Sequence, residues 1–344
     1  MLQDCQFCSV VSKNNGEDPI GTAVVCDRWL LIETPFPWSM EKWQSDPSMR
    51  PTLELFQHLI LDQGMKLRPL AIAPDRVYSQ IGYRRVLYYE RPAPMFSRYV
   101  QQEYLVPTDQ VHDLLVALLT QPERLSEFLD YRQPGETRDL MICTHGNIDV
   151  ACARFGIPIY KQLRNQYASA LDDSGDPPVV GPETASGQAA IPLRVWRCSH
   201  FGGHRFAPTL IDLPTGQLFG HLEPQHLEPL VRQQGEWSEL NRCYRGWAGG
   251  DPLVQVVERE LWMRFGWDWL AWTRQGVVTS PFEEDSPSNA IVQLEFQQPD
   301  GTVKHCEAMV EIIGEVETAS GSGVDMALKS VKQYRVSRLV LNED

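Results

Sequence analysis

Residues 138–156 read RDLMICTHGNIDVACARFG, and this stretch decides the fold expected for the chain. The apolar run Arg138–Cys143 predicts a buried strand, and the polar, turn-forming residues after it predict a loop. The residues around Cys152 then predict the first turns of a helix. A strand that passes through a short loop into a helix is a building unit of layered α/β proteins, so the sequence predicts the α/β class.

Upstream of this stretch, the chain predicts a similar series of elements. They are a strand at 28–33 (RWLLIE), a helix at 51–64, strands at 66–73 and 84–91, and a capped helix that begins near Thr108 or Asp109. The order strand, helix, strand, strand, helix indicates a thioredoxin-like unit. Because RWLLIE aligns with RDLMIC, we expect two related halves, of which the N-terminal half is degenerate.

Downstream, the pattern predicts a continuing helix through residues 157–171, a surface loop at 172–188 and two strands around the turn Pro214–Gly216. From Asn241 the character changes to a helix that begins at Asp251 and a hairpin that turns at 299–301. The sequence therefore predicts three domains. They are a thioredoxin-like α/β domain at 1–135, a second thioredoxin-like domain at 136–240 and a small accessory α+β region at 241–344.

The composition limits the function classes. A formal net charge of −14 argues against a nucleic-acid partner, because phosphate binding relies on clustered Lys and Arg. No apolar run approaches the roughly 20 residues of a membrane span, and the N-terminus lacks the features of a secretory signal. We therefore expect a cytoplasmic protein without a membrane partner. In a reducing compartment, its eight cysteines favour buried thiols, metal ligands or catalytic thiols over disulfides.

Two pairs of side chains form the candidate metal site. Cys143 and Cys152 are separated by eight residues, and the loop between them can curl so that both sulfurs face one point. His200 and His204 flank two glycines, which favour a tight loop over the helix of a zinc hydrolase. Two thiolates and two imidazoles are the ligand set of a [2Fe–2S] centre with one histidine-bound iron.

Zinc has the same ligand set, so a structural zinc site remains an alternative. The eight residues between Cys143 and Cys152 argue against it, because zinc knuckles typically place two to four residues between paired cysteines. A second alternative is a thioredoxin-fold thiol oxidoreductase or binding module without a cluster. In that case Cys5 and Cys8, or Cys143 and Cys152, would act as thiols.

Two motifs, CTHGNIDVAC at 143–152 and HFGGHRFAP at 200–208, make the chain resemble the sucrase/ferredoxin-like family and its thioredoxin-like ferredoxin domain. The opening CSVVSKNNGEDPIGTA and the strand RWLLIETPFPW extend the resemblance toward the N-terminus. The resemblance implies that 136–240 is a ferredoxin domain. It also implies a [2Fe–2S] cluster held by Cys143, Cys152, His200 and His204. No carboxylate pair supports glycoside hydrolysis.

We therefore expect an electron carrier, more readily than a stand-alone catalyst, that serves an unidentified redox partner protein. Two imidazoles should raise the reduction potential above that of a cluster with four thiolates. Because a bound imidazole can exchange its second ring proton, electron transfer should also be coupled to pH.

The remaining cysteines and one histidine are weaker candidates. Cys5 and Cys8 form a CxxC motif that precedes the first strand, whereas a thioredoxin redox pair follows one. Cys198 should share a strand face with His200, as a neighbouring thiol or an alternative ligand. His145 is expected to be exposed. The cysteines without a motif, which we expect to be buried thiols, are Cys26, Cys243 and Cys306.

Overall fold

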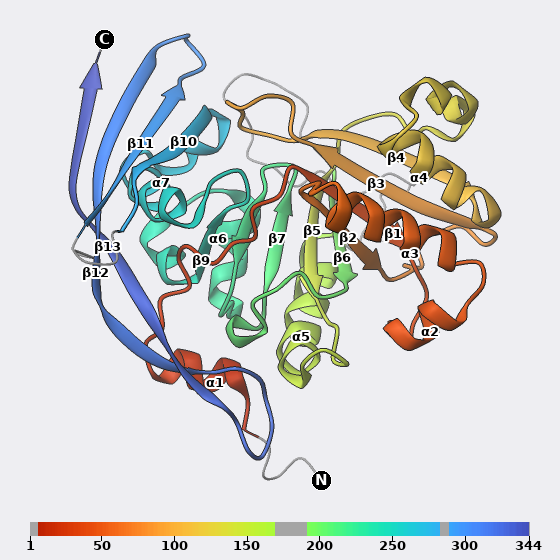
Figure 1. The fold of residues 1–344 in the computed structure, drawn as a ribbon, viewed down its shortest axis with the longest axis horizontal. Coiled ribbons are helices and arrows are strands. Elements are labelled where there is room, and N and C mark those ends of the chain that lie inside the picture. The colour runs from red at the N-terminus through yellow and green to blue at the C-terminus, as the bar shows by residue number, and fades with distance from the viewer. Residues whose placement is uncertain (1–5, 169–190, 283–288, 344) are drawn as a thin grey trace.

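The computed structural model describes residues 6–168, 191–282 and 289–343, which form helices around two β-sheets (Figure 1). The larger sheet is mixed and has nine strands in the order β4-β3-β1-β2-β6-β5-β7-β8-β9. The smaller sheet is antiparallel and has the order β10-β11-β12-β13. The predicted α/β class is confirmed.

The first half of the large sheet contains four strands, and its helices follow the first and the last of them. In chain order the elements are β1 (Arg28–Glu33), α2 (Met40–Ser45), α3 (Arg50–Gln57), a π-helical turn (His58–Asp62), β2 (Leu67–Ile72), β3 (Tyr83–Glu90), β4 (Val100–Pro107), α4 (Val111–Leu119) and a 3₁₀ segment (Pro122–Tyr131). The bounds of β1 match the prediction.

The second half repeats this series. Its elements are β5 (Arg138–Cys143), α5 (Val150–Tyr167), β6 (Leu193–Cys198), β7 (Leu210–Leu213), β8 (Gln217–Phe219) and α6 (Leu227–Arg232), after which β9 (Tyr244–Trp247) adds one more strand. The bounds of β5 match the prediction, and β7 and β8 flank the predicted turn at Pro214–Gly216. The predicted continuation of α5 to residue 171 and most of the loop at 172–188 lie outside the described residues.

The two halves have the same topology. In the first half β1 lies between parallel β2 and antiparallel β3, and β4 follows β3. In the second half β5 lies between parallel β6 and antiparallel β7, and β8 follows β7. The halves meet where β2 pairs with β6 in the antiparallel sense, at Ile72 and Cys198. The division into domains at 135 and 240 stays a prediction.

One strand of the first half was missing from the sequence prediction. The predicted order contained two strands after the first helix, whereas the structure has three, the third being β4. The sequence of β4, VQQEYLVP, does not alternate cleanly between apolar and polar residues. One of its polar residues, Glu103, is buried in an ion-pair network rather than exposed. A buried charge of this kind hides a strand from a hydrophobicity pattern.

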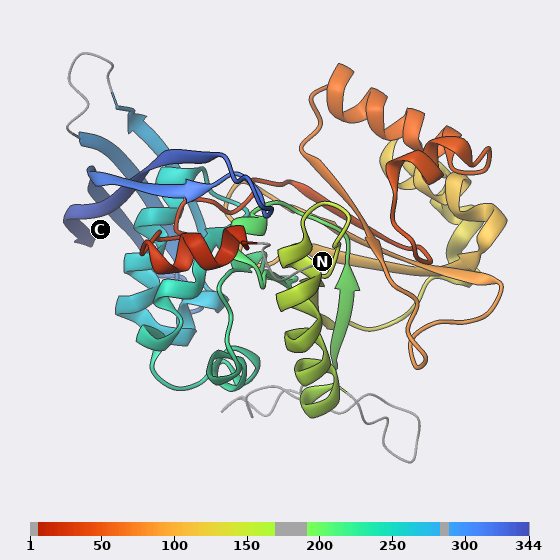
Figure 2. The same cartoon turned by 90° about the horizontal axis from the view of Figure 1, so that it is seen from below.

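The C-terminal region packs α7 (Pro252–Phe265) against the small sheet. This sheet contains β10 (Thr273–Ser280), β11 (Asn289–Gln297), β12 (Val303–Ala319) and β13 (Leu328–Glu343). The helix beginning after Asp251 and the hairpin turning at 299–301 are as predicted. The tip of the β12–β13 hairpin reaches the N-terminal helix α1 (Cys8–Asn14), as Figures 1 and 2 both show. This contact brings α1 and the tip of the β12–β13 hairpin to the candidate metal site.

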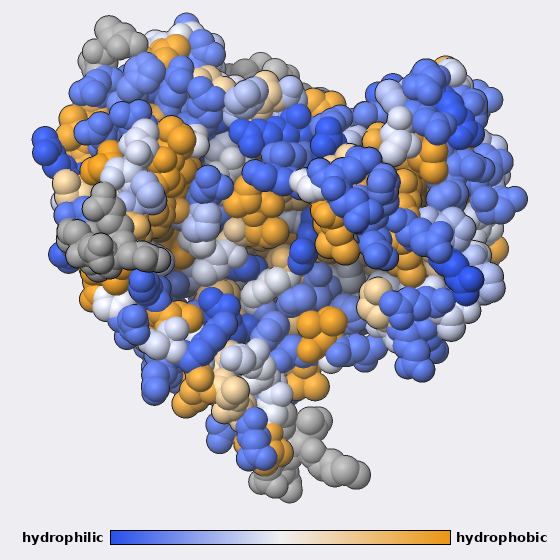
Figure 3. All heavy atoms as spheres, viewed as in Figure 1, coloured by the Kyte–Doolittle hydropathy of each residue, from blue (hydrophilic) through white to orange (hydrophobic). Residues whose placement is uncertain are grey.

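The surface view in Figure 3 is largely hydrophilic, with apolar side chains in separate patches. Within the described residues, no helix is both long and apolar enough to cross a membrane.

Candidate metal centre

The end of β5 and the start of α5 bring Cys143 and Cys152 together. Asp149 caps α5, because its side chain accepts a hydrogen bond of 2.8 Å from the backbone N–H of Ala151. Gly156 lets the helix approach the strand closely, since a Cβ atom there would lie 2.1 Å from the Cys143 carbonyl oxygen. Both cysteines are buried, with exposed fractions of 1% and 0%.

The loop after β6 brings His200 to the two sulfurs. The His200 Nδ1 atom lies 3.8 Å from the Cys143 Sγ and 3.8 Å from the Cys152 Sγ. These three ligand atoms all lie within 4.8 Å of one another. The predicted cysteine pair therefore meets one of the two predicted histidines, His200, at one point. The His200–His204 segment begins as a loop, as predicted, with both Gly202 and Gly203 at positive φ.

His204 lies beside His200, with ring centroids 5.6 Å apart. Its Nδ1 atom faces a second group, at 3.3 Å from the Cys8 Sγ and 3.4 Å from the Asp149 Oδ2. Ser322, at the tip of the β12–β13 hairpin, holds Asp149 with a hydroxyl hydrogen bond of 2.6 Å and a backbone N–H hydrogen bond of 2.8 Å. Cys8, Asp149 and His204 thus form a second set of potential metal ligands within 4.8 Å of one another.

Sequence reasoning missed most of this second set. Cys8 was noticed only as part of a CxxC motif, and Cys5 lies outside the described residues. Asp149 carried one local signal, its position directly before a helix, which is typical of an N-cap. Ser322 carried none, because it reaches the site through the long β12–β13 hairpin.

The two thiols of the first set differ in their acidity. A hydrogen bond from Cys152, and then one from His200, lower the pKa of Cys143 to about 5 against the opposing effect of burial. The same hydrogen bond, followed by burial, raises the pKa of Cys152. The pair therefore holds one thiolate readily and the second with difficulty, unless a cation compensates the charge.

The second set differs in its protonation. Burial raises the pKa of the Cys8 thiol to about 11, with the Ser322 hydroxyl opposing this effect. Burial also lowers the pKa of His204, against the opposing charge of Asp149. At neutral pH the second set thus contains a neutral thiol and a carboxylate, and it is a weaker group of metal donors than the first.

The expectation that His145 is exposed is wrong. Its ring is buried, at an exposed fraction of 9%, and packs edge-on against Trp38 at 5.7 Å between centroids. The Nδ1 atom accepts a hydrogen bond of 3.4 Å from the His200 backbone N–H, and Nε2 donates one of 2.9 Å to the Trp38 carbonyl. His145 thus ties the His200 loop to the segment after β1.

The other described cysteines are free thiols, and all are buried. Cys198 pairs in register with Cys143 across the two parallel strands, but its sulfur belongs to neither set of potential ligands. Burial, and then the charge of Cys143, raise its pKa well above the ordinary range. The prediction that Cys26, Cys243 and Cys306 are buried thiols is confirmed.

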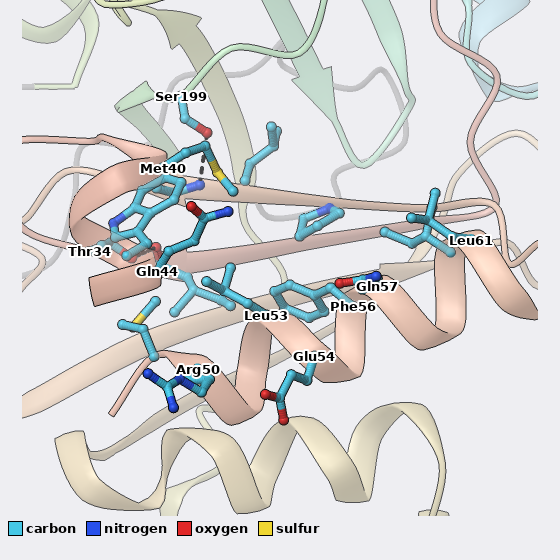
Figure 4. Close-up of a pocket in the computed structure, with 17 residues that line it drawn as sticks. Thr34, Met40, Gln44, Arg50, Leu53, Glu54, Phe56, Gln57, Leu61 and Ser199 are labelled. Carbon is cyan, nitrogen blue, oxygen red and sulfur yellow. Dashed lines mark hydrogen bonds between the residues drawn. The ribbon is translucent and has the colours of Figure 1, made fainter. Parts of the chain in front are cut away.

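A cavity of about 620 Å³ lies on the first-half side of the site, between α3 and the strands β1 and β2 (Figure 4). Its walls are mainly apolar and include Met40, Trp43, Leu53 and Phe56. Ser199 closes one end, where its hydroxyl accepts a hydrogen bond of 3.0 Å from the Ala71 N–H. The cavity therefore reaches the residue next to His200, but no candidate ligand lines it.

Comparison with protein families gives one match. A family model described as Suc_Fer-like, Sucrase/ferredoxin-like, matches residues 19–246, which is more than half of the chain. The matched region covers both halves of the large sheet and includes Cys143, Cys152, His200 and His204. No curated protein and no solved structure matches the chain.

Proposed function

The chain belongs to the sucrase/ferredoxin-like family, and on that premise we propose that it is an electron-transfer protein that binds one [2Fe–2S] cluster through Cys143, Cys152, His200 and His204. The observation that carries the proposal is the position of the His200 Nδ1 atom, 3.8 Å from each cysteine sulfur. Such a cluster supplies a centre that accepts and releases one electron at a time.

The donor set fits this group better than it fits a lone zinc ion. One metal can bind the two sulfurs and the His200 nitrogen, but the His204 ring is turned toward Asp149 and Cys8. A diiron core needs two ligands on each metal, and it therefore draws on a wider set of donors than a single tetrahedral ion. His204, whose ring lies 5.6 Å from that of His200, would supply the fourth donor to such a core.

Neighbouring side chains would fix the orientation of the histidines. With its Nδ1 proton donated to Asp149, His204 would present Nε2 as its ligand atom. His145 would hold the His200 backbone through the hydrogen bond to its N–H. The buried surroundings of the two thiols exclude water, and this favours a stable, slowly exchanging metal site.

Metal and sulfide analysis after anaerobic purification tests the proposal. We expect brown protein with about two irons and two sulfides per chain. Cys143→Ala should abolish the visible absorbance, whereas Cys306→Ala, at a buried thiol of the small sheet, should retain it. Colourless protein with one zinc per chain would establish the zinc alternative, and colourless, metal-free protein would favour the thiol alternative.

A further variant tests the role of the histidines. His200→Cys should keep a cluster but lower its reduction potential, because an additional thiolate makes the addition of an electron less favourable. The wild-type potential should also fall as the pH rises from about 6 to about 10, if an imidazole proton is lost in that range. A potential that is independent of pH would contradict the coupling of electron and proton transfer.

A further inference from the structure

Arg245, in β9, is a buried cation without an anionic partner among the described residues. Its exposed fraction is 2%, and its guanidinium donates only to neutral oxygens. These are the Thr22 hydroxyl at 3.1 Å, the Thr22 carbonyl at 2.6 Å and the Gly202 carbonyl at 3.0 Å. By contrast, the buried guanidinium of Arg194 pairs with two carboxylates.

The guanidinium lies directly against the loop that carries the two histidines. A Cβ atom at Gly203 would lie 2.5 Å from the Arg245 Cζ, so a larger residue at this position would displace the guanidinium. Gly203 also has a φ of 78°, which favours glycine. The second glycine of the HFGGH motif is therefore required by the approach of Arg245 as well as by the turn.

The thiolates of Cys143 and Cys152, two of the candidate ligands, favour the charged form of Arg245. Burial and the charge of Arg205 lower the pKa of Arg245 to about 9, while Cys143 and Cys152 act in the opposite direction. An unpaired buried charge is strongly unfavourable, so a protein that keeps one is expected to have an anion to balance it. No carboxylate among the described residues forms an ion pair with Arg245, and the negative groups that favour its charged form are the thiolates of the candidate site.

We propose that Arg245 balances the charge of the reduced metal site and thereby raises its reduction potential. This inference rests on the proposed function. Two thiolates and two neutral imidazoles leave an oxidised [2Fe–2S] site near zero net charge. One electron delivered by a redox partner protein lowers that charge by one unit. No bond forms or breaks in the chain, and Arg245 keeps its proton in both states.

The test is a potentiometric titration of purified full-length protein, followed by visible absorbance and electron paramagnetic resonance. Arg245→Gln removes the charge but keeps a hydrogen-bonding side chain, and Arg245→Lys keeps the charge. For Arg245→Gln, the ratio of reduced to oxidised protein at a fixed potential should fall about tenfold, which is about 59 mV for one electron. For Arg245→Lys the ratio should stay within about threefold of wild type.

Thr22→Val is the matched structural control. It removes one acceptor of the Arg245 guanidinium and leaves the charge in place, so the ratio should again stay within about threefold of wild type. Iron content and circular dichroism would show that each variant is folded and loaded. If Arg245→Gln does not accumulate, Arg245→Met, which also removes the charge, takes its place, and the same tenfold fall in the ratio is expected.

Three results would overturn the inference. These are a ratio within twofold of wild type for Arg245→Gln, a tenfold fall for Arg245→Lys, and a tenfold fall for Thr22→Val. The last two would show that the hydrogen-bond geometry, rather than the charge, sets the potential. Wild-type protein without iron would instead defeat the proposed function itself, and this is visible before any variant is made.

Discussion

In the first half of the large sheet β1 ends at Glu33, whereas in the second half β5, the strand in the equivalent position, ends at Cys143. Both residues are buried, and both lie beside a parallel partner strand. Burial raises the pKa of Glu33, with the Ser79 hydroxyl opposing this effect. Equivalent strand ends thus carry a carboxyl in one half and a candidate metal ligand in the other.

The crossover helices of the two halves differ in how closely they approach the sheet. In the first half, α3 leaves a cavity of about 620 Å³ above β1 and β2. In the second half, Gly156 lets α5 lie directly on the end of β5. Strand order alone therefore does not form the candidate metal site, because both halves share it. The site also needs a helix close enough to place its first turn beside the strand end.

The largest expected effect, loss of the bound iron, should follow when α5 can no longer approach β5 closely. In Gly156→Ala the new Cβ would overlap the Cys143 carbonyl oxygen, so α5 must move away from β5 and carry Cys152 with it. We expect iron and visible absorbance to be lost, while far-ultraviolet circular dichroism remains. Lys161→Ala, at an exposed position of the same helix, should retain both. Full iron content in Gly156→Ala would show that close helix packing is not required.

A second prediction concerns the network that joins the halves. Arg194 of β6 donates to Glu103 of β4 at 2.8 and 2.9 Å and to the fully buried Asp139 of β5 at 2.8 Å. Asp139→Asn removes one of the two carboxylates that pair with Arg194. The free energy of unfolding measured in urea should therefore fall by about 3–5 kcal/mol.

The matched control for this network is an exposed ion pair. Glu311→Gln removes the carboxylate that pairs with Arg335 on the small sheet, and it should cost at most about 1 kcal/mol. A single transition in both variants would indicate that the halves unfold together. Two separate unfolding transitions in Asp139→Asn would show that this network couples two halves of different stability.

The sequence predicted those parts of the molecule that have local patterns. The strands β1 and β5 are short apolar runs between polar neighbours, and their bounds matched. The CTHGNIDVAC and HFGGH motifs identified side chains that do lie together in the fold. β4 was missed because Glu103 belongs to a buried network that no single stretch of sequence reveals.

The surroundings of the site could not be predicted for the same reason. Cys8, Arg245 and Ser322 each come from a separate element, and only the packing of α1, β9 and the β12–β13 hairpin brings them to the histidine loop. His145 was expected to be exposed in the loop after Cys143, but Trp38 of the first half packs against it. Contacts between distant segments decide these positions, and periodicity does not encode them.

The smallest expected effect is a loss of stability in acid, and we expect it in the second half of the large sheet. His221, which follows β8, is buried against Phe206 of the histidine loop, and its Nε2 atom lies 3.1 Å from the Ser12 hydroxyl. Burial, and then the charge of Lys13, lower its pKa from 6.5 to about 4. In the first half, His58 is exposed and pairs with Asp62 instead.

The unfolded chain binds a proton at His221 below about pH 6.5, whereas the folded chain binds it only below about pH 4. The contribution of neutral His221 to the free energy of unfolding is therefore complete above this range of pH. It is lost as the pH falls from about 6.5 to about 4. At pH 5 the loss should be about 2 kcal/mol relative to pH 7. The measurement is urea unfolding of iron-free protein at both pH values, combined with hydrogen exchange to locate the change. His221→Asn, which tolerates the positive φ at this position, should lose about 2 kcal/mol less than wild type over the same interval. Exchange should increase first around β8 and residues 199–206. An earlier opening of β1–β4 would contradict the assignment of acid sensitivity to the second half.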